Sequence, residues 1–258
     1  MAGGTPANPA TLASPPLALP GAAPDVPVGP EHANQQQHAP KGDYCEALIH
    51  DTNTDRSACR RFLLVKLGIV KVKLDREVNA YVVADSTTKE AIVIDPGLPV
   101  DKLVDQVKGF KVRFIVATHC HPGHVAGKDD LKELTGGLTA IHSADAKQFL
   151  RSADKYLFDG DELEFGEFKL SVMHTPGHTP GSVCYVVANH AFVGDTILAG
   201  GIGRQTPETD LRRQMMSIGT KLLRLPPATA LYPGHGPATS LERELAQNPI
   251  FRGAGARA

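Results

Sequence analysis

The sequence contains no tryptophan, and aromatic residues make up only 5% of its 258 residues. It has no apolar run near the roughly 20 residues that a membrane-spanning helix needs, so we expect no membrane association. Positive and negative charges are nearly balanced, since the sequence has 27 Lys and Arg residues and 28 Asp and Glu residues, which gives a net charge of −1. This balance gives no electrostatic basis for binding nucleic acid or an anionic membrane.

Cysteine is also scarce, and its four copies form no C-x-x-C pair. Such spacing indicates neither a disulfide framework nor a cysteine-based metal site. Free thiols are typical of a reducing compartment, so we expect a cytoplasmic protein. A bridge between Cys45 and Cys59 remains the alternative.

Lys and Arg are absent from positions 1–40, which hold nine of the 20 prolines and nine alanines. This composition cannot bury enough apolar surface to offset the entropy of ordering, which predicts disorder. The segment lacks the basic start and continuous apolar stretch of a secretory signal. With the mixed, polar stretch 41–60 it forms a predicted disordered tail and linker, 1–60, followed by one folded domain, 61–258.

Hydrophobic periodicity over the predicted domain alternates between strand and helix patterns. Such strands with interspersed helices, in two similar halves, predict an α/β layered fold. The predicted strands are 62–74, 78–84, 91–94, 111–118, 139–141, 161–165, 167–173, 182–188, 191–194 and 229–232. The predicted helices are 100–107, a segment with Leu131 and Leu134 that stops at Gly136, Ser143 to Leu150, 208–224, and Ser240 to Ala246.

The segment F-I-V-A-T-H-C-H-P-G-H places three histidines directly after a buried strand. Residues two apart in an extended segment point the same way, so His119 and His121 are expected to converge. His124 approaches the same place across a predicted Pro-Gly loop. A lone histidine here would be a surface residue, but three at this spacing favour a metal site, because imidazole is the commonest metal ligand.

Three later strand ends repeat this arrangement. His178 follows the strand that ends in V-M-H-T-P-G, Asp195 ends F-V-G-D, and His235 lies in Y-P-G-H-G. Together the four strand ends present five imidazoles and one carboxylate. Such a set forms one or two metal sites with positions left open for water, which is the pattern of a catalytic rather than a structural site.

The ordered motifs T-H-C-H-P-G-H, T-P-G-H-T-P-G-S, G-D-T and Y-P-G-H-G resemble the metallo-β-lactamase superfamily, in particular its glyoxalase II-like, short single-domain branch. The resemblance covers residues 62 to about 251. It implies a four-layer αβ/βα sandwich with the metal site at one edge of the sheets, and one or two zinc ions, with iron as an alternative. It assigns His119, His121 and His178 to a first metal, His124 and His235 to a second, and Asp195 to a bridge between them.

Position 123 departs from that family's motif, H-x-H-x-D-H, because a glycine stands where the family has an aspartate that ligates the second metal. We therefore expect the first site to fill and the second to be weak, completed by water or empty. Asp129 and Asp130 are interpreted as solvated charges of a following helix and not as substitute ligands.

Two further side chains carry open interpretations. Asp95, in I-V-I-D-P-G, either supports the metal site from behind, as a matching aspartate does in the resembling family, or only forms a turn. Arg204, in the glycine-rich loop after Asp195, either holds an anionic group of a substrate or is a solvated surface arginine.

The remaining candidates are assigned structural roles. Cys120 alternates away from its two histidine neighbours and is interpreted as a buried thiol. His174 is interpreted as a packing or supporting residue. The histidines without partnered spacing are expected at the surface: His32, His38, His50, His142 and His190.

The resemblance implies a metallo-hydrolase, a glyoxalase II-like thioesterase, that cleaves a small-molecule thioester or related ester through metal-bound hydroxide, with Asp195, His119 and His121 in catalysis. The absence of a G-x-S-x-G motif agrees, since such a reaction needs no serine nucleophile. Without a carboxylate at Gly123 the reaction is expected to be slow. Two alternatives remain: a mononuclear iron persulfide dioxygenase with ligands His119, His178 and Asp195, and a metal-binding remnant without catalysis.

Overall fold

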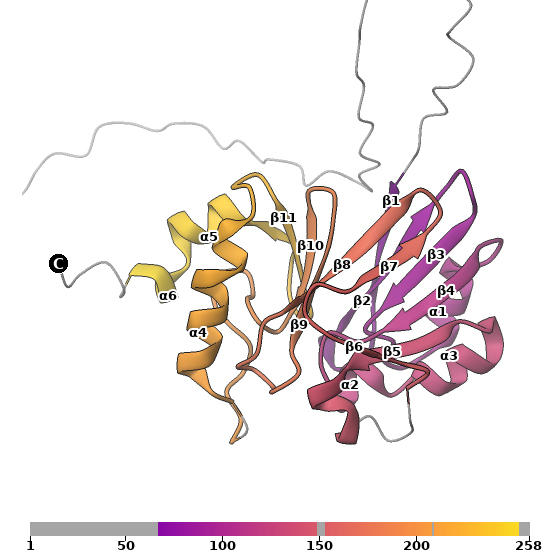
Figure 1. Ribbon diagram of the computed structural model, residues 1–258, viewed down its shortest axis with the longest axis horizontal. Helices are drawn as coiled ribbons and strands as arrows, with labels where there is room; N and C mark the ends of the chain where they lie inside the picture. The colour runs from indigo at the N-terminus through magenta and orange to yellow at the C-terminus, as the bar shows by residue number, and fades with distance from the viewer. Residues whose placement is uncertain (1–66, 149–152, 208, 253–258) are drawn as a thin grey trace, which may run out of the picture. The chain divides into compact units, whose positions relative to one another are not determined.

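The computed structural model describes residues 67–148, 153–207 and 209–252, which form two six-stranded mixed sheets (Figure 1). In the first sheet the strands follow chain order, and β3, β4, β5 and β6 run parallel. Its strands are β1 (Leu67–Lys73), β2 (Asn79–Asp85), β3 (Glu90–Ile94), β4 (Lys111–Val116), β5 (Leu138–His142) and β6 (Lys155–Leu157).

The second sheet has the reverse order, from β12 to β7, and only its β10–β11 pair is parallel. Parallel neighbours end at the same edge of a sheet, so this pair brings two strand ends together. The strands are β7 (Glu162–Phe165), β8 (Phe168–His174), β9 (Val183–Val187), β10 (His190–Gly194), β11 (Ala230–Pro233) and β12 (Thr239–Ser240).

Helices lie on the outer faces of both sheets, with α1 and α3 against the first and α4 and α5 against the second (Figure 1). The helices are α1 (Asp101–Gln106), α2 (Pro122–Val125), α3 (Lys128–Thr135), α4 (Leu211–Thr220), α5 (Leu241–Gln247) and α6 (Pro249–Arg252). Three 3₁₀ turns cover Asp75–Glu77, Ser143–Gln148 and Leu222–Arg224.

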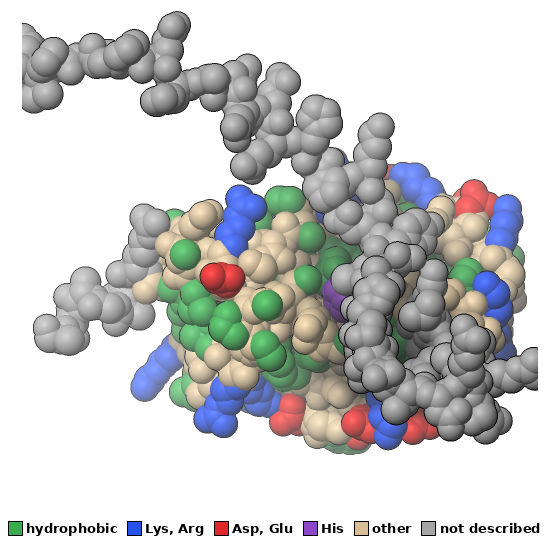
Figure 2. All heavy atoms as spheres, turned by 90° about the horizontal axis from the view of Figure 1, so that it is seen from above, with side chains coloured by type: hydrophobic (Ala, Val, Ile, Leu, Met, Phe, Trp, Pro, Cys, Tyr) green, Lys and Arg blue, Asp and Glu red, His purple; other side chains and the backbone are tan. Residues whose placement is uncertain are grey.

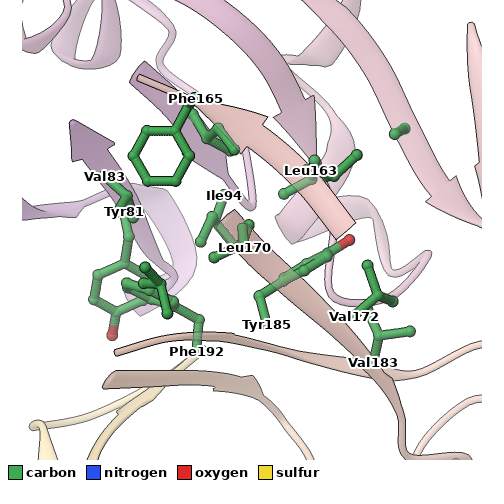
Figure 3. Packing of buried hydrophobic residues seen from close by; sticks show 14 of the residues in the cluster. Tyr81, Val83, Ile94, Leu163, Phe165, Leu170, Val172, Val183, Tyr185 and Phe192 are labelled. Carbon is green, nitrogen blue, oxygen red and sulfur yellow. The ribbon is translucent and has the colours of Figure 1, made fainter. Parts of the chain in front are cut away.

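The central hydrophobic core lies between the two sheets (Figure 3). Tyr81 and Ile94 contribute from the first sheet, and Leu170, Tyr185 and Phe192 from the second, each at most 1% exposed. Separate cores under α1 and α3 and under α4 and α5 fill the outer layers. This succession of helices, sheet, sheet and helices is the four-layer αβ/βα sandwich that the sequence implied.

The predicted strands are confirmed, with ends within two residues over the described part of the chain. Side chains also cap helices as expected: the Ser240 hydroxyl accepts a hydrogen bond from the backbone N–H of Arg243 at the start of α5. At the end of α3, Gly136 adopts the left-handed conformation that stops a helix (φ 72°).

Three local predictions were wrong. Residues 122–125 form the one-turn helix α2 and not a loop, since Pro122 at the first helical position has a φ suited to a helix start. The helix predicted from Ser143 is a 3₁₀ turn. The helix predicted over 208–224 leaves helical geometry at Lys221, so that α4 and a 3₁₀ turn replace it. The short strand β6 was not predicted, because three residues carry too little alternation.

Several predictions concern residues outside the described part of the chain. They are the tail and linker at 1–60, the start of the strand predicted at 62–74, the Cys45–Cys59 alternative, and Leu150. None of the helices in the described residues is long and apolar enough to cross a membrane. Where side chains are visible in Figure 2, acidic and basic groups are interspersed along the margins of that face, in keeping with the small net charge.

Candidate metal centre

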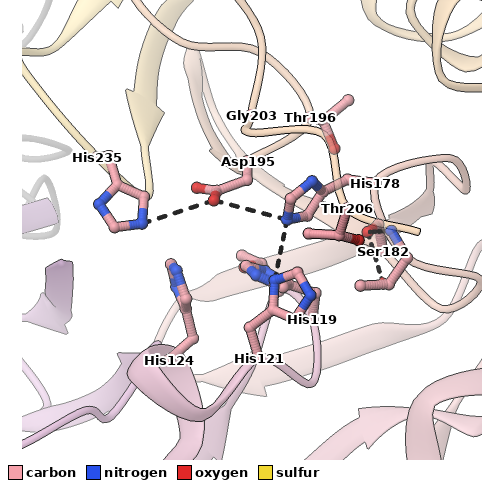
Figure 4. A network of polar contacts seen from close by, with 12 residues as sticks. His119, His121, His124, His178, Ser182, Asp195, Thr196, Gly203, Thr206 and His235 are labelled. Carbon is pink, nitrogen blue, oxygen red and sulfur yellow. Dashed lines mark hydrogen bonds and ion pairs between the residues drawn. The ribbon is translucent and has the colours of Figure 1, made fainter. Parts of the chain in front are cut away.

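The ends of five strands meet at one edge of the two sheets. The histidine and aspartate side chains labelled in Figure 4 lie close together there. Asp95 and His119 follow the parallel strands β3 and β4, while Asp195 and His235 follow the parallel strands β10 and β11. His178 follows β8. Binding sites of sheet proteins form where the carboxyl ends of strands leave a crevice, and the sequence-predicted residues converge at such a place.

His119, His121 and His178 form a first group whose ligand atoms lie within 4.8 Å of one another. Their rings meet edge to face, with centroids 4.7 to 4.8 Å apart. His178 Nε2 lies 3.1 Å from His121 Nδ1. The strand β4 ends at Val116 and the chain bends at Thr118, so the loop, and not strand alternation as predicted, brings His119 and His121 together.

A second group combines His119, His124 and Asp195, also within 4.8 Å. Asp195 Oδ2 lies 3.6 Å from His178 Nε2 and 3.5 Å from His235 Nε2, so this carboxylate stands between the two groups. His235 stacks edge to face with His124 and is the more open member, with 34% of its side chain exposed. The structure thus brings all six predicted ligands together, but His119 takes part in both groups.

Burial lowers the pKa of three of these histidines, and nearby carboxylates overcome this effect at His124. Burial and then the neighbouring histidines hold the pKa of His119 well below its usual value, and burial lowers the pKa of His178 to about 4. Both are therefore neutral at pH 7, which is the form that binds metal. Burial also disfavours the charged form of His124, but the Asp95 and Asp195 carboxylates outweigh it and raise its pKa.

Four buried polar atoms of the predicted ligand residues lack hydrogen-bond partners among the described residues. They are His119 Nε2, His178 Nδ1, Asp195 Oδ1 and His124 Nδ1, of which only the last faces a charged group, the Asp95 carboxylate. Leaving a buried polar atom unsatisfied costs about 1–3 kcal/mol, so such atoms call for a partner that a protein side chain does not supply. Imidazole nitrogens with a carboxylate are the donor set that zinc and iron accept. The residues therefore fit a metal.

The match to a family model decides the fold family: residues 74–235 match the metallo-beta-lactamase superfamily. The chain belongs to the metallo-β-lactamase superfamily. The matched range runs from the end of β1 to His235 and so includes every residue of the two ligand groups.

Similar proteins within the superfamily are named for different activities. Human mitochondrial persulfide dioxygenase ETHE1 is 33% identical over 179 residues, covering 66% of this chain and 69% of the relative. The probable metallo-hydrolase YqgX of Bacillus subtilis is 33% identical over 203 residues, covering 69% of this chain and 93% of the relative. The crystal structure of TTHA1623 in a di-iron-bound form superposes with a TM-score of 0.61 and 31% identity, over 70% of this chain and 99% of that one.

Asp95 connects the two ligand groups of this superfamily site from behind. Its Oδ1 accepts hydrogen bonds from the Thr118 backbone N–H (2.7 Å) and hydroxyl (3.0 Å), and its Oδ2 lies 3.1 Å from His124 Nδ1. The Thr118 hydroxyl in turn lies 3.0 Å from His119 Nδ1. Of the two interpretations left open by the sequence, support of the site is the one that these contacts favour. Contacts of this kind fix the ring orientation of metal-ligating histidines.

Replacing Asp95 with asparagine is expected to weaken the second metal about 10- to 100-fold, while the first is retained. Asn tolerates the left-handed backbone of Asp95 (φ 57°) and keeps its size, but it removes the charge that faces His124 Nδ1. Competition with a chromophoric chelator measures both affinities. Equal weakening of both metals, or no weakening, would contradict the assignment of Asp95 to His124.

Other supporting residues were not predicted from the sequence. Asp145, in the 3₁₀ turn after β5, accepts hydrogen bonds from the backbone N–H groups of Cys120 and Gly181, which ties the loop of His119 and His121 to that of His178. Gln214 on α4 donates to the backbone carbonyl oxygen of Asp195 at 3.2 Å. Isolated Asp and Gln residues give no periodic or motif signal, so only the fold could reveal them.

Two glycines allow the ligands to approach closely. A Cβ at Gly234 would lie 2.5 Å from Asp195 Oδ1 and 2.7 Å from His124 Cε1. A Cβ at Gly203 would lie 2.3 Å from the Asp195 carbonyl oxygen. Gly234 of Y-P-G-H-G and Gly203, just before Arg204, are therefore steric requirements of the centre.

The ligand residues open into a cavity of about 310 Å³. Arg204 lines it, as the interpretation of this residue as a substrate contact requires, but Arg76 also lines it and was not predicted. Gly123 forms part of the wall. Asp129 and Asp130 belong to neither ligand group, and Asp130 is exposed, in line with their interpretation as helix charges.

The remaining histidine and cysteine predictions have mixed outcomes, and His32, His38 and His50 lie outside the described residues. Cys120 is buried, and His174 packs, with its ring stacked on His142 at a centroid distance of 3.9 Å. His142, however, is only 6% exposed, so its prediction as a surface residue was wrong. It ends β5, and His174 ends β8 in the other sheet, so their stacking covers both rings. His190 is half-buried, with Nδ1 3.0 Å from the Tyr232 hydroxyl.

Proposed function

We propose that the protein is a metal-dependent hydrolase that cleaves a thioester or a related ester of a small molecule. The observation that carries this proposal is the position of Asp195 between two groups of histidines that share one cavity. A centre built for a single structural metal needs four enclosing ligands, whereas this one has more donors than one ion takes and opens to solvent.

In this proposal His119, His121 and His178 would hold the first metal, His124 and His235 would hold the second, and Asp195 would contribute a carboxylate to both. Zinc would supply a Lewis acid there and would lower the pKa of a water molecule to about 7. Asp195, His119 and His121 are the residues assigned to catalysis, because they hold and orient the reacting groups.

The buried surroundings of these residues suit such a reaction. The lowered pKa values of His119 and His178 keep their nitrogen lone pairs available near neutral pH. Asp95 and Thr118 hold the rings from behind, so little reorganisation is needed when a substrate binds. Gly123 supplies no carboxylate to orient the attacking group, and for this reason the hydrolysis is expected to be slow.

A second candidate function is persulfide oxygenation with a single iron. The similarity to human persulfide dioxygenase favours it, as does the compatibility of His119, His178 and Asp195 with one ion. The absence of a carboxylate at Gly123 also favours a single occupied site. A metal-binding protein without catalysis is the remaining alternative.

Metal content and two assays separate these functions. Protein purified without a histidine tag is expected to contain zinc, at one to two equivalents by elemental mass spectrometry, and to cleave acyl thioesters without consuming oxygen. About one equivalent of iron together with oxygen uptake on glutathione persulfide would replace the hydrolase with the dioxygenase. Bound metal with neither activity would leave the non-catalytic alternative.

A further inference from the structure

The turn between β1 and β2 contains two consecutive residues in the left-handed conformation, Arg76 (φ 56°) and Glu77 (φ 60°). Residues other than glycine rarely adopt this conformation, and such strain persists only where the surrounding structure holds it in place. Strained backbone is common at functional sites, so the two left-handed residues indicate that this turn has a functional role.

The turn is held on both sides. The Asp75 backbone N–H donates to the Leu98 carbonyl oxygen (2.9 Å), and the Glu77 carbonyl oxygen lies 3.1 Å from His235 Nδ1. The second contact leaves His235 Nε2 facing Asp195. The same turn that orients a proposed metal ligand therefore also places Arg76 on the wall of the cavity.

A second cavity of about 220 Å³ adjoins the one that holds the metal ligands. Arg76, Pro122 and Gly123 line both cavities, so the two meet at Gly123, while Leu98 and Ala126 line only the second. A Cβ at Gly123 would meet only Val78 Cγ2, at 3.0 Å. At position 123, where the family motif has an aspartate, this chain has open space, and the Arg76 side chain lines the same two cavities.

The two arginines of the cavities form no ion pair with any of the residues that the structure describes, unlike Arg113, which pairs with Glu90 at 2.8 Å. Arg76 and Arg204 are both exposed. Asp75 lines the second cavity but forms no ion pair with Arg76. The two parallel N–H donors of a guanidinium match the two oxygens of a carboxylate. An anionic group is therefore the ligand that suits these two arginines on the cavity wall.

We propose that Arg76 is a specificity-determining residue that binds an anionic group of the substrate, a carboxylate or its equivalent, in the space beside Gly123. The inference rests on the proposed function, because it assumes that the reacting bond lies at the metal ligands. It assigns the substrate to the class of thioesters that carry a negative charge a few bonds from the scissile carbonyl.

Matched thioesters that differ only in this charge test the proposal. Succinyl and butanoyl thioesters of N-acetylcysteamine place the charge in the acyl part, and acetyl thioesters of 3-mercaptopropionate and propanethiol place it in the thiol part. The metal-loaded wild-type protein is expected to prefer the anionic member of at least one pair by about tenfold or more in kcat/KM, with the difference mainly in KM.

The Arg76→Gln variant is expected to lose this preference, Arg76→Lys to keep part of it, and Arg224→Gln, at an exposed arginine away from the cavities, to keep all of it. The neutral thioester controls for damage to the turn, since a displaced His235 would slow both members of a pair alike. An equal preference in wild type and Arg76→Gln would overturn the proposal.

Calorimetric binding of the matching thioethers, which cannot be cleaved, separates this proposal from the proposed function. If wild-type protein cleaves neither thioester but binds the anionic thioether in an Arg76-dependent way, hydrolysis is wrong and the anion site stands. If it cleaves thioesters without any dependence on Arg76 in rate or binding, hydrolysis stands and the anion site is wrong.

Discussion

Replacing Asp195 with alanine is expected to remove most of the bound metal and to reduce turnover more than about 100-fold. Asp195 Oδ2 lies within 3.6 Å of both His178 and His235, and its Oδ1 is buried without a hydrogen-bond partner in the described residues. Loss of a residue that only supports a ligand costs about 10- to 100-fold in metal affinity or activity, and loss of a bridging ligand should cost more. Elemental analysis after dialysis measures the metal.

The exposed Asp130 provides a matched control, because Asp130→Ala removes a carboxylate just after the histidine motif without touching either ligand group. That variant should keep wild-type metal and activity. Circular dichroism would show whether Asp195→Ala still folds, and Asp195→Asn, which keeps the shape against Gly234, offers a second test. Full metal retention in folded Asp195→Ala would refute the bridging role.

The sequence predicted which residues converge at this edge because the signals are local. His119, His178, Asp195 and His235 each lie within about four residues of a strand end, and all but His119 directly follow a glycine, a residue that marks turns and loops. Parallel strands such as β10 and β11 then place those ends at one edge, and the superfamily motifs fix which strand ends meet. Periodicity and motif therefore agreed on the same residues.

The residues that the sequence did not reveal act across long chain separations. Arg76 reaches the cavity only because contacts to Leu98 and His235 hold its turn in place. The sequence around Arg76 has no pattern that predicts a left-handed turn. Asp145 joins two loops through backbone N–H groups more than 20 residues away. His142 was placed at the surface because the stacking partner that covers it, His174, belongs to the other sheet.

Both ligand groups depend on docking of the two sheets, because each combines side chains that follow strands of the first sheet with one that follows a strand of the second. His235 lies in a loop of the second sheet, yet the hydroxyl of Tyr81 and the amide of Asn79, both on β2, donate to the Pro233 carbonyl oxygen at 2.6 and 2.9 Å. These buried hydrogen bonds fix the loop against the first sheet. A change at this junction is therefore expected to displace His235.

Restoring the family's carboxylate with Gly123→Asp is expected to tighten the second metal and to raise hydrolysis of a neutral thioester by up to about 100-fold. The position accepts a side chain, because Gly123 lies in α2 without a positive φ and its Cβ would meet only Val78. A reacting group that is held in place gains about this factor over one misplaced by 1 Å. Metal titration followed by kcat/KM on the butanoyl thioester measures both effects.

The same substitution should act differently on an anionic substrate. A carboxylate at position 123 would line both cavities beside Arg76, so it would repel the negative group that we assign there. Gly123→Asp is thus expected to raise hydrolysis of the butanoyl thioester more than that of the succinyl thioester, whereas Gly123→Asn, equal in size but uncharged, should raise neither to the same degree. Unchanged or lower hydrolysis of both substrates in a folded variant would mean that something other than the missing carboxylate limits this centre.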